Sequence, residues 1–376
     1  MRLPRVLAEM LSLPTASFLE QAVLGFVRER SRRLAGVTVR SDRYGNLLVR
    51  YRHRPRRVRP LLFSGHTDHP GFVAHRMTND RMLLAEFRGG VYAEYFPAAR
   101  VRFWSDGRWV RGRVRAVTKS KEVHRLIGKM RLPRQALVEV ASPVRPNSPG
   151  MWDFPDPVLR GDRVYARGCD DVAGCAAMLE LLERLSRKRA AAHVYCLFTR
   201  AEEVGFVGAI AAARNRIIPK RLPIVAIETS SARAGAAIGG GPVLRVGDKA
   251  STFTPQLDAF CARVARRLAD RSASFQFQRK LMDGGTCEST AFAAYGYEVT
   301  GICLALGNYH NMDVARRRIA PEYISLKDWK RMVDWFEALV VDRRGYGGED
   351  ARLRAEMEKR YRRWRPLLSA TAKRES

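Results

Sequence analysis

Two consecutive acids, Asp170 and Asp171, stand where an extended segment gives way to a helix in the stretch ARGCDDVAGCAAMLE, residues 166–180. The apolar residues that follow, such as Met178 and Leu182, recur at helical spacing. A single Asp before a helix is usually an N-cap. Here, however, three other segments also end an apolar, strand-like run with His, Asp or Glu. The two acids are therefore candidates for chemistry as well as for capping.

The first of these segments is GHTDHP, residues 65–70, which follows the buried-type run PLLFS. His66 and Asp68 are two positions apart, so on an extended chain their side chains project to the same side. A His that binds a metal usually passes its other N–H to a carboxylate, which fixes its tautomer. The pair therefore fits a metal ligand and its orienting acid, and a solvated polar turn is the alternative.

The other two segments add carboxylates. Glu202 and Glu203 follow the run HVYCLFT, and Glu228 ends the run LPIVAI. Adjacent carboxylates on extended backbone point in opposite directions, so one of the pair can bind a metal while the other reaches a bound water. The alternative for this pair is an acidic helix N-terminus favoured by the helix dipole. His310 lies in the loop behind the last core strand, residues 298–306.

Strands that alternate with helices predict an α/β fold with a mixed, mostly parallel sheet and helices on both faces. An amphipathic helix at residues 324–341 closes this fold. In such sheets, ligands bind outside the carboxyl ends of the strands. Imidazole and carboxylate together suit zinc, with cobalt or manganese as alternatives, and the number of candidates suffices for two ions that share one carboxylate. Seven ligand-type residues fall at that edge: His66, Asp68, Asp170, Glu202, Glu203, Glu228 and His310.

Between residues 71 and 158 the sequence pattern changes to short runs of alternating apolar and polar residues, separated by turns that contain Gly, Asp and Pro. This pattern is typical of a small β-barrel-like module and suggests a lid inserted into the α/β domain. We therefore expect three parts. Residues 1–70 and 159–345 form the catalytic α/β domain, residues 71–158 form the inserted β lid, and residues 346–376 form a basic C-terminal extension.

Composition limits the partners. The net charge is +30, which would attract nucleic acid non-specifically. The basic residues are spread along the chain, however, so a bias toward arginine on solvated faces explains them better and a nucleic-acid partner is not expected. No apolar run is long enough to cross a bilayer, and the N-terminus lacks the features of a secretory signal. The six cysteines form no CxxC pair. We expect a cytoplasmic protein with reduced, buried thiols.

The order and spacing of the motifs resemble the tetrahedral aminopeptidase family, which includes bacterial glutamyl aminopeptidases and belongs to the co-catalytic zinc peptidases. The resemblance runs from about Leu13 to Val341. It rests on the motifs LPTASF, DRYGNL, GHTDHPGFV, GDRV, CDDVAGCAAMLE, AEEVGFVGA, GGGPVLRVGD, GGTCESTA and YHNM.

The resemblance implies a role for each candidate. The first metal takes His66, Asp170 and Glu228, and the second metal takes Asp170, Glu203 and His310. Asp68 orients His66, the peptide bond between Asp170 and Asp171 is cis, and Glu202 is the general base. The resemblance also implies a peptide substrate, a homo-oligomer, and a β module that is both lid and subunit contact.

The sequence departs from the family at three positions. His69 and Cys287 replace family acids, Glu and Asp respectively, and Glu228 replaces an Asp. Among related peptidases, an Asp at the position of Glu228 is typical of aminopeptidases, and a Glu there is typical of carboxypeptidases and acylamino-acid hydrolases. An aminopeptidase acting on short peptides is the leading hypothesis. The alternatives are a carboxypeptidase-like or N-acyl-amino-acid amidohydrolase on the same site, and an inactive scaffold that binds nucleic acid through its basic surface.

Overall fold

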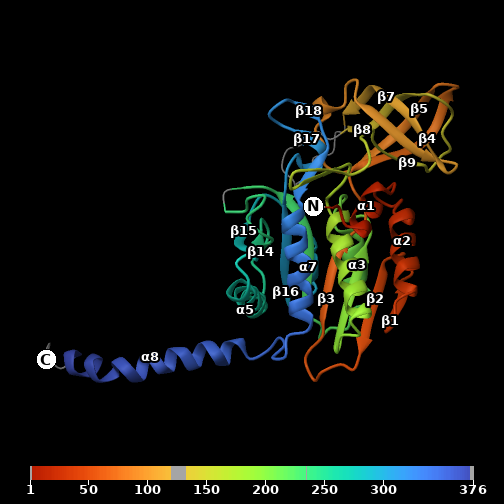
Figure 1. Ribbon diagram of the computed structural model, residues 1–376. Helices are drawn as coiled ribbons and strands as arrows, with labels where there is room; N and C mark the ends of the chain where they lie inside the picture. Colours follow the sequence, from red (N-terminus) through yellow and green to blue (C-terminus); the bar gives the residue numbers. More distant parts are fainter. Residues whose placement is uncertain (1, 120–132, 234, 373–376) are drawn as a thin grey trace.

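The computed structural model describes residues 2–119, 133–233 and 235–372. Its centre is an eight-stranded sheet in the order β1-β2-β12-β3-β13-β16-β14-β15 (Figure 1). The four middle strands are parallel to one another, and antiparallel pairs lie toward both edges. The strands span β1 Val37–Ser41, β2 Leu47–His53, β3 Leu61–His66, β12 Ala192–Thr199, β13 Ile224–Ser231, β14 Val243–Asp248, β15 Gln278–Met282 and β16 Val299–Leu306. The prediction of a mixed, mostly parallel sheet is confirmed.

Helices cover both faces of this sheet because its middle strands are apolar on both sides. Successive residues of β3 show the alternation: Phe63 joins the core beneath α3 and α7, and Leu62 joins the core beneath α4 and α6. The helices span α1 Arg5–Ser12, α2 Gln21–Arg32, α3 Val172–Arg187, α4 Val207–Arg214, α5 Pro255–Arg271, α6 Glu288–Ala294, α7 Leu326–Val340 and α8 Glu349–Ala372. None of the helices in the described ranges is long and apolar enough to span a membrane.

A closed six-stranded barrel in the order β4-β5-β8-β7-β6-β9 stands above the sheet (Figure 1). Its core packs aromatic rings edge to face, among them Phe72, Phe96 and Trp152. The strands span β4 Gly71–Asn79, β5 Met82–Arg88, β6 Arg100–Ser105, β7 Arg108–Lys119, β8 Pro133–Val140 and β9 Pro149–Trp152. The expected β-barrel-like insertion is therefore present as an observed barrel.

A small sheet, β10-β11-β19, connects the barrel side of the molecule to the central sheet. Its strands are β10 Val158–Arg160, β11 Arg163–Ala166 and β19 Glu322–Ser325. Two further short strands, β17 Met312–Asp313 and β18 Arg318–Ile319, pair with each other, and single turns of 3-10 helix occur at η1 Ala93–Tyr95 and η2 Tyr309–Asn311. The helix predicted for residues 324–341 begins two residues late. Its first residues complete β19, and Ser325 caps α7 by accepting the N–H of Asp328.

Candidate metal centre

His66 is the last residue of β3, and its side chain is buried at the carboxyl end of the sheet. Its ring Nδ1 lies 3.2 Å from the backbone carbonyl oxygen of Asp68. A carbonyl only accepts, so Nδ1 carries a proton and Nε2 is the nitrogen that faces the neighbouring acids. That nitrogen lies 3.5 Å from Asp170 Oδ1 and 3.5 Å from Glu228 Oε1. His66 is thus oriented as a metal ligand requires.

Asp68 is buried beside the loop that follows β12. Its two carboxylate oxygens accept the backbone N–H groups of Glu202 (3.0 Å) and Glu203 (3.2 Å). The same carboxylate lies 3.5 Å from His66 Nδ1. Asp68 therefore fixes the loop that carries the adjacent glutamates, in addition to facing His66.

Asp170 and Asp171 precede α3, and the peptide bond between them is cis. Asp171 occupies the N-cap position, but its side chain makes no capping hydrogen bond. Instead, its Oδ1 accepts the hydroxyl of Thr229 on β13 at 2.9 Å. Gly174 is required here, because a Cβ at that position would lie 2.2 Å from Asp171 Oδ1. The capping alternative is therefore wrong for the Asp171 side chain.

His310 lies in η2, behind the end of β16, with a left-handed backbone (φ 53°). Its Nδ1 lies 2.8 Å from the carbonyl oxygen of Gly90, on the segment that leaves β5 of the barrel. By the same logic as for His66, Nδ1 carries a proton and Nε2 faces the acids. Nε2 lies 3.2 Å from Glu203 Oε2 and 3.8 Å from Asp170 Oδ2.

Together these side chains form one cluster with two ends. The ligand atoms of His66, Glu202 and Glu228 lie within 4.8 Å of one another, and so do those of His66, Asp170 and Glu203. Asp170 faces both ends, since Oδ1 points to His66 and Oδ2 points to His310. The structure thus brings all seven sequence-predicted residues to the carboxyl edge of the sheet.

The cluster concentrates negative charge in a buried place. Burial raises the pKa of Asp170 well above its usual range, and Glu228 raises that pKa further. Burial likewise raises the pKa of Glu202 well above its usual range. For Glu228 burial acts in the same upward direction, but contact with His66 prevails and lowers the pKa to about 2. Buried carboxylates that repel one another are stabilised by a cation.

The polar atoms at the centre of the cluster fit divalent metal ions. Within the described ranges, His66 Nε2, Asp170 Oδ1 and Glu203 Oε1 are buried without a hydrogen-bond partner. Leaving such groups unpaired is costly. Two imidazoles, each with Nδ1 facing a backbone carbonyl, and several carboxylates are a donor set for zinc, cobalt or manganese. The residues present therefore fit a metal centre.

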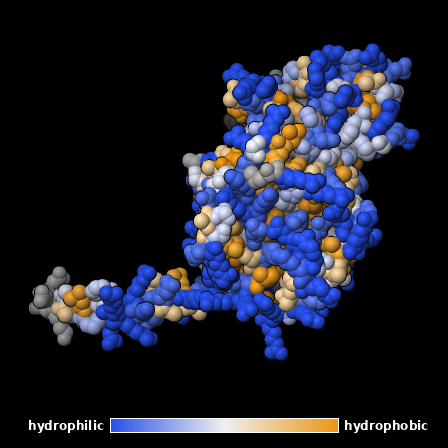
Figure 2. All heavy atoms as spheres, in the orientation of Figure 1, coloured by the Kyte–Doolittle hydropathy of each residue, from blue (hydrophilic) through white to orange (hydrophobic). Residues whose placement is uncertain are grey.

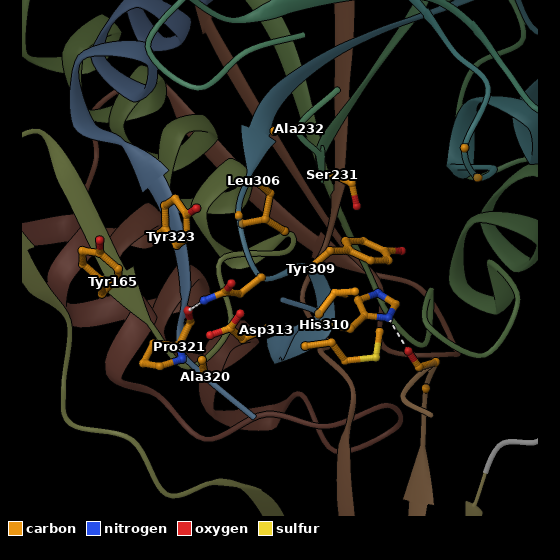
Figure 3. A pocket seen from close by; sticks show the side chains of 18 of the residues that line it. Tyr165, Ser231, Ala232, Leu306, Tyr309, His310, Asp313, Ala320, Pro321 and Tyr323 are labelled. Atoms are coloured by element: carbon orange, nitrogen blue, oxygen red, sulfur yellow. Dashed lines mark hydrogen bonds between the residues drawn. The ribbon is translucent and has the colours of Figure 1, made fainter. Parts of the chain in front are cut away.

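The cluster opens into a cavity of about 1300 Å³ between the sheet edge and the barrel. Figure 3 views this cavity, with the ring of Tyr309 beside that of His310. The two ring centroids are 3.7 Å apart. Glu202 and Glu203 also line the cavity. A small molecule or peptide end in this space has direct access to the candidate metal ligands.

Two positions that depart from the family pattern lie close to the cluster. The His69 ring nitrogens lie 2.8 Å from the Asp170 carbonyl oxygen and 3.0 Å from Asn311 Oδ1, so His69 joins the α3 entrance to the η2 turn. Cys287 precedes α6, and its backbone N–H donates to Asp248 Oδ2 at 3.1 Å. Cys287 lies buried in a core cluster with side chains of β3 and α4.

Sequence reasoning missed two buried glutamates that hold the site. Glu322 Oε2 accepts the backbone N–H groups of Cys169 (2.6 Å) and Asp170 (3.1 Å), and Oε1 accepts that of His310 (2.8 Å). Glu20 accepts the N–H of Ala201 at 3.0 Å and so fixes the start of the Glu202 loop. A charged residue inside the apolar run PEYIS was the available signal for Glu322, since an acid in a buried strand needs partners.

The comparisons with known proteins agree with this fold. An aminopeptidase from the archaeon Desulfurococcus kamchatkensis has a structure that superposes with a TM-score of 0.72 at 21% identity, covering 90% of this chain and 94% of that one. The TET1 peptidase of Pyrococcus horikoshii gives a TM-score of 0.72 at 20% identity, covering 90% of this chain and 98% of that one. At this level of identity the likeness concerns the fold.

A curated protein of Acetivibrio thermocellus that carries the name of an aminopeptidase is 28% identical over 142 residues. This match covers 35% of the chain and 38% of the relative, so the chain spans well under half of that protein's length. The profile of the M42 glutamyl aminopeptidase family matches residues 45–318, which include all seven candidate residues. The resemblance drawn from the motifs is thereby confirmed, and the chain belongs to the M42 glutamyl aminopeptidase family.

Proposed function

We propose that this chain is a metal-dependent aminopeptidase that hydrolyses short peptides at a pair of divalent ions. The observation that carries the proposal is the position of Asp170. One of its oxygens lies 3.5 Å from His66 Nε2, and the other lies 3.8 Å from His310 Nε2. A single carboxylate between two oriented imidazoles is the arrangement that two ions sharing one bridging ligand require.

The proposed ligands divide into two sets that share Asp170. The first ion takes His66, Asp170 and Glu228, and the second ion takes Asp170, Glu203 and His310. When bound, such a pair of ions supplies Lewis acidity, which lowers the pKa of a water molecule and stabilises negative charge developing on the substrate. We propose zinc as the native metal, with cobalt or manganese as alternatives.

Glu202 is the proposed general base. Its side chain is buried at the cavity wall, and its Oε2 lies 3.9 Å from His66 Nε2. Asp68 accepts the backbone N–H of Glu202 and so fixes the loop that presents this carboxylate. A buried carboxylate with an upward-shifted pKa is suited to take a proton from water and to deliver it to the leaving amine.

The test replaces Glu202 while the ligands stay in place. Glu202→Gln should lower kcat on aminoacyl anilides by about 10²–10⁴-fold, with the metal content of the purified protein unchanged. Glu203→Gln is the matched neighbour, and it should lose metal as well as activity. A fully active Glu202→Gln enzyme would show that this residue is not the base.

A substrate panel separates the aminopeptidase from its nearest rival. Free aminoacyl anilides and N-acetylated aminoacyl anilides differ only in the terminal amine. Hydrolysis of the free compounds supports the aminopeptidase, and hydrolysis of the acetylated compounds alone favours an N-acyl-amino-acid amidohydrolase. Metal analysis of the same preparation identifies the ions.

Assembly is a further part of the proposal. The Pyrococcus horikoshii relative assembles into a tetrahedron or a large octahedral shell. By analogy we propose a homo-oligomer, with residues 71–158, which contain the barrel, as lid and subunit contact and residues 1–70 and 159–345 as the catalytic part. Light scattering on the purified chain measures the number of subunits. The cytoplasmic location and the absence of a nucleic-acid partner stay predictions.

A further inference from the structure

The C-terminal helix α8 extends away from the rest of the molecule. It has 24 residues, so it is about 36 Å long. Figures 1 and 2 show it projecting from the base of the sheet into solvent. Every residue from 353 to 372 is exposed. It also lies beyond residues 45–318, which match the family profile.

The root of α8 is fixed to the body. Tyr346, which precedes the helix, is buried and packs against Phe260 of α5. Asp342 pairs with Arg263 (3.2 Å) and with Arg267, and Asp350 accepts hydrogen bonds from Gln256. These packing and polar contacts to α5 set the direction in which α8 leaves the body of the protein. The exposed part of α8 is therefore presented in a defined orientation.

One face of the projecting helix is apolar. Five of the six exposed large apolar side chains of α8 are spaced four, four, three and four residues apart, which aligns them in one stripe, and Leu367 lies beside this stripe. These side chains are 43% to 66% exposed. The opposite face is basic and carries Arg352, Lys359 and Arg362. The stripe consists of Leu353, Met357, Tyr361, Trp364 and Leu368. A continuous stripe of this kind on an exposed helix marks an interaction surface.

The two halves of α8 carry opposite charge. Residues 349–358 contain four acids and two arginines, a net charge of −2. Residues 359–372 contain one lysine, four arginines and no acid, a net charge of +5. A partner that matches this helix must therefore be basic beside its first half and acidic beside its second half. A second α8 running in the opposite direction has this distribution.

We propose that α8 pairs with α8 of a second copy of this chain, antiparallel and about a two-fold axis. In the register that places Leu353 opposite Leu368, Met357 falls opposite Trp364. Tyr361 then lies next to the axis and meets its own copy. The same stripe thus supplies both sides of the interface, as an isologous contact demands.

The charges satisfy the same register. In an antiparallel pair, residues on one flank of a helix face residues on the same flank of the other. Glu356 and Arg363 share one flank, and Glu358 and Arg365 share the other. Each acid then lies within about two residues, or 3 Å along the axis, of the arginine it faces. Exchanging the two copies repeats each pair, so four ion pairs border the stripe.

The geometry also separates the charged bodies. Each chain carries a net charge of +30, so two copies repel one another at short range. Antiparallel pairing places the two roots at opposite ends of the paired helices, about 36 Å apart. That distance exceeds the screening length of about 8 Å at physiological salt. The helix pair therefore keeps the two roots farther apart than the distance over which their charges interact strongly.

Disulfide cross-linking of the full chain tests the pairing. The six native cysteines are buried, so a cysteine introduced on α8 is the reactive one. Tyr361→Cys should give a disulfide-linked dimer on mild oxidation. Lys359→Cys, on the basic face, is the control and should cross-link about tenfold less, because a disulfide needs its Cα atoms within roughly 7 Å. Equal cross-linking of the two variants would overturn the proposal.

Mixing experiments test the direction. Leu353→Cys and Leu368→Cys should cross-link to each other when mixed, and neither should cross-link efficiently with itself. Self-linking of each variant without mixed dimers would mean a parallel pair and would reject this geometry. Glu356→Arg should weaken the Tyr361→Cys cross-link, and adding Arg363→Glu should restore it. These readouts do not depend on catalysis or on contacts between the bodies.

A lipid surface is the competing occupant of the stripe. Vesicles that contain phosphatidylserine attract basic amphipathic helices. The competing result has two parts: the chain floats with such vesicles but Trp364→Glu does not, and Tyr361→Cys gives no cross-link in solution. That result would overturn the pairing and identify a membrane as the partner of the stripe. A cross-link without flotation supports the pair.

Discussion

The two ends of the candidate metal centre are built in different ways. We call His66, Glu228 and the Oδ1 side of Asp170 the sheet half, because β3 and β13 are neighbouring parallel strands. We call Glu203, His310 and the Oδ2 side of Asp170 the loop half, because both outer ligands lie on irregular segments. Hydrogen bonds of the sheet ladder position the first half. Side-chain contacts to backbone groups position the second.

The difference between strand-borne and loop-borne ligands indicates which parts of the site depend on residues far away in the sequence. A strand end is fixed locally, because its neighbours in the sheet hold it on both sides. The His310 turn has left-handed backbone at Asn308, His310 and Asn311, which is uncommon outside glycine, more accessible to Asn and His than to most residues, and held here with support from other segments. Glu322 and the Gly90 carbonyl provide that support. The loop half should therefore be the more easily damaged half.

Replacing the shared ligand should break both halves at once. Asp170→Asn weakens the one carboxylate that faces both imidazoles, so both ions should be lost. Since metal ions contribute several kcal/mol of transition-state stabilisation, activity should fall by about 10³-fold or more. Metal analysis after dialysis and kcat on an aminoacyl anilide measure the two effects. Retention of both ions by Asp170→Asn would rule out a shared bridging ligand.

Replacing Glu322 should weaken the loop half more than the sheet half, although Glu322 also holds the backbone of the shared Asp170. Glu322→Gln replaces an oxygen that accepts a backbone N–H with an NH₂ group, which disturbs either the Asp170 N–H contacts or the His310 N–H contact. Loss of such a supporting contact typically costs about 10–100-fold in metal affinity or activity. The weaker-bound ion should be the one lost, giving one ion per subunit instead of two. Glu29→Gln, on the exposed surface of α2, is the control. An unchanged metal content in Glu322→Gln would contradict the assignment of that glutamate.

The smallest expected effect concerns stability beneath the sheet half. Glu288 at the start of α6 accepts the hydroxyl of Ser64 at 2.8 Å, and burial raises its pKa to about 7, although nearby His66 lowers it. The pKa of an unfolded Glu is about 4.3, so the folded chain holds an extra proton between these two pKa values. The contribution to stability is complete below the lower value and is lost as the pH rises through the upper one.

Glu288→Gln should therefore flatten the pH dependence of unfolding between pH 5 and 7. The largest slope that one such group contributes is about 1.4 kcal/mol per pH unit. Urea unfolding of the metal-free chain at several pH values measures it, with Glu29→Gln again as control. Identical slopes for Glu288→Gln and the unaltered chain would mean that Glu288 titrates normally.

The sequence was sufficient to predict the fold and the residues that meet at the sheet edge. His66, Asp170 and Glu228 follow or end apolar runs, and the rule that ligands gather at the carboxyl ends of parallel strands brings them together. The inserted β module could also be predicted, because short alternating runs separated by turns are typical of β-strands in a small barrel or sandwich. The roles of the ligands and the division into parts stay proposals.

What could not be predicted depends on contacts between residues far apart in the chain. Glu20 reads as an ordinary acid before a helix, yet it is buried and binds the N–H of Ala201. Glu322 precedes the predicted helix and belongs to no motif, yet it lies in β19 and binds N–H groups of two separate segments. Periodicity carries no information about such pairings, since they are decided by tertiary packing. The boundary of α7 was misplaced for the same reason.

The hydrogen bond between His310 and Gly90 has a mechanical consequence. Gly90 belongs to the stretch that leaves the barrel, and a Cβ there would lie 3.3 Å from His310 Nδ1. A shift of the barrel by even one ångström therefore stretches or compresses the only described contact that keeps the His310 proton on Nδ1. Forces applied to the outer rim of the molecule reach the candidate metal centre through this hydrogen bond and through Met312, which packs in the barrel core.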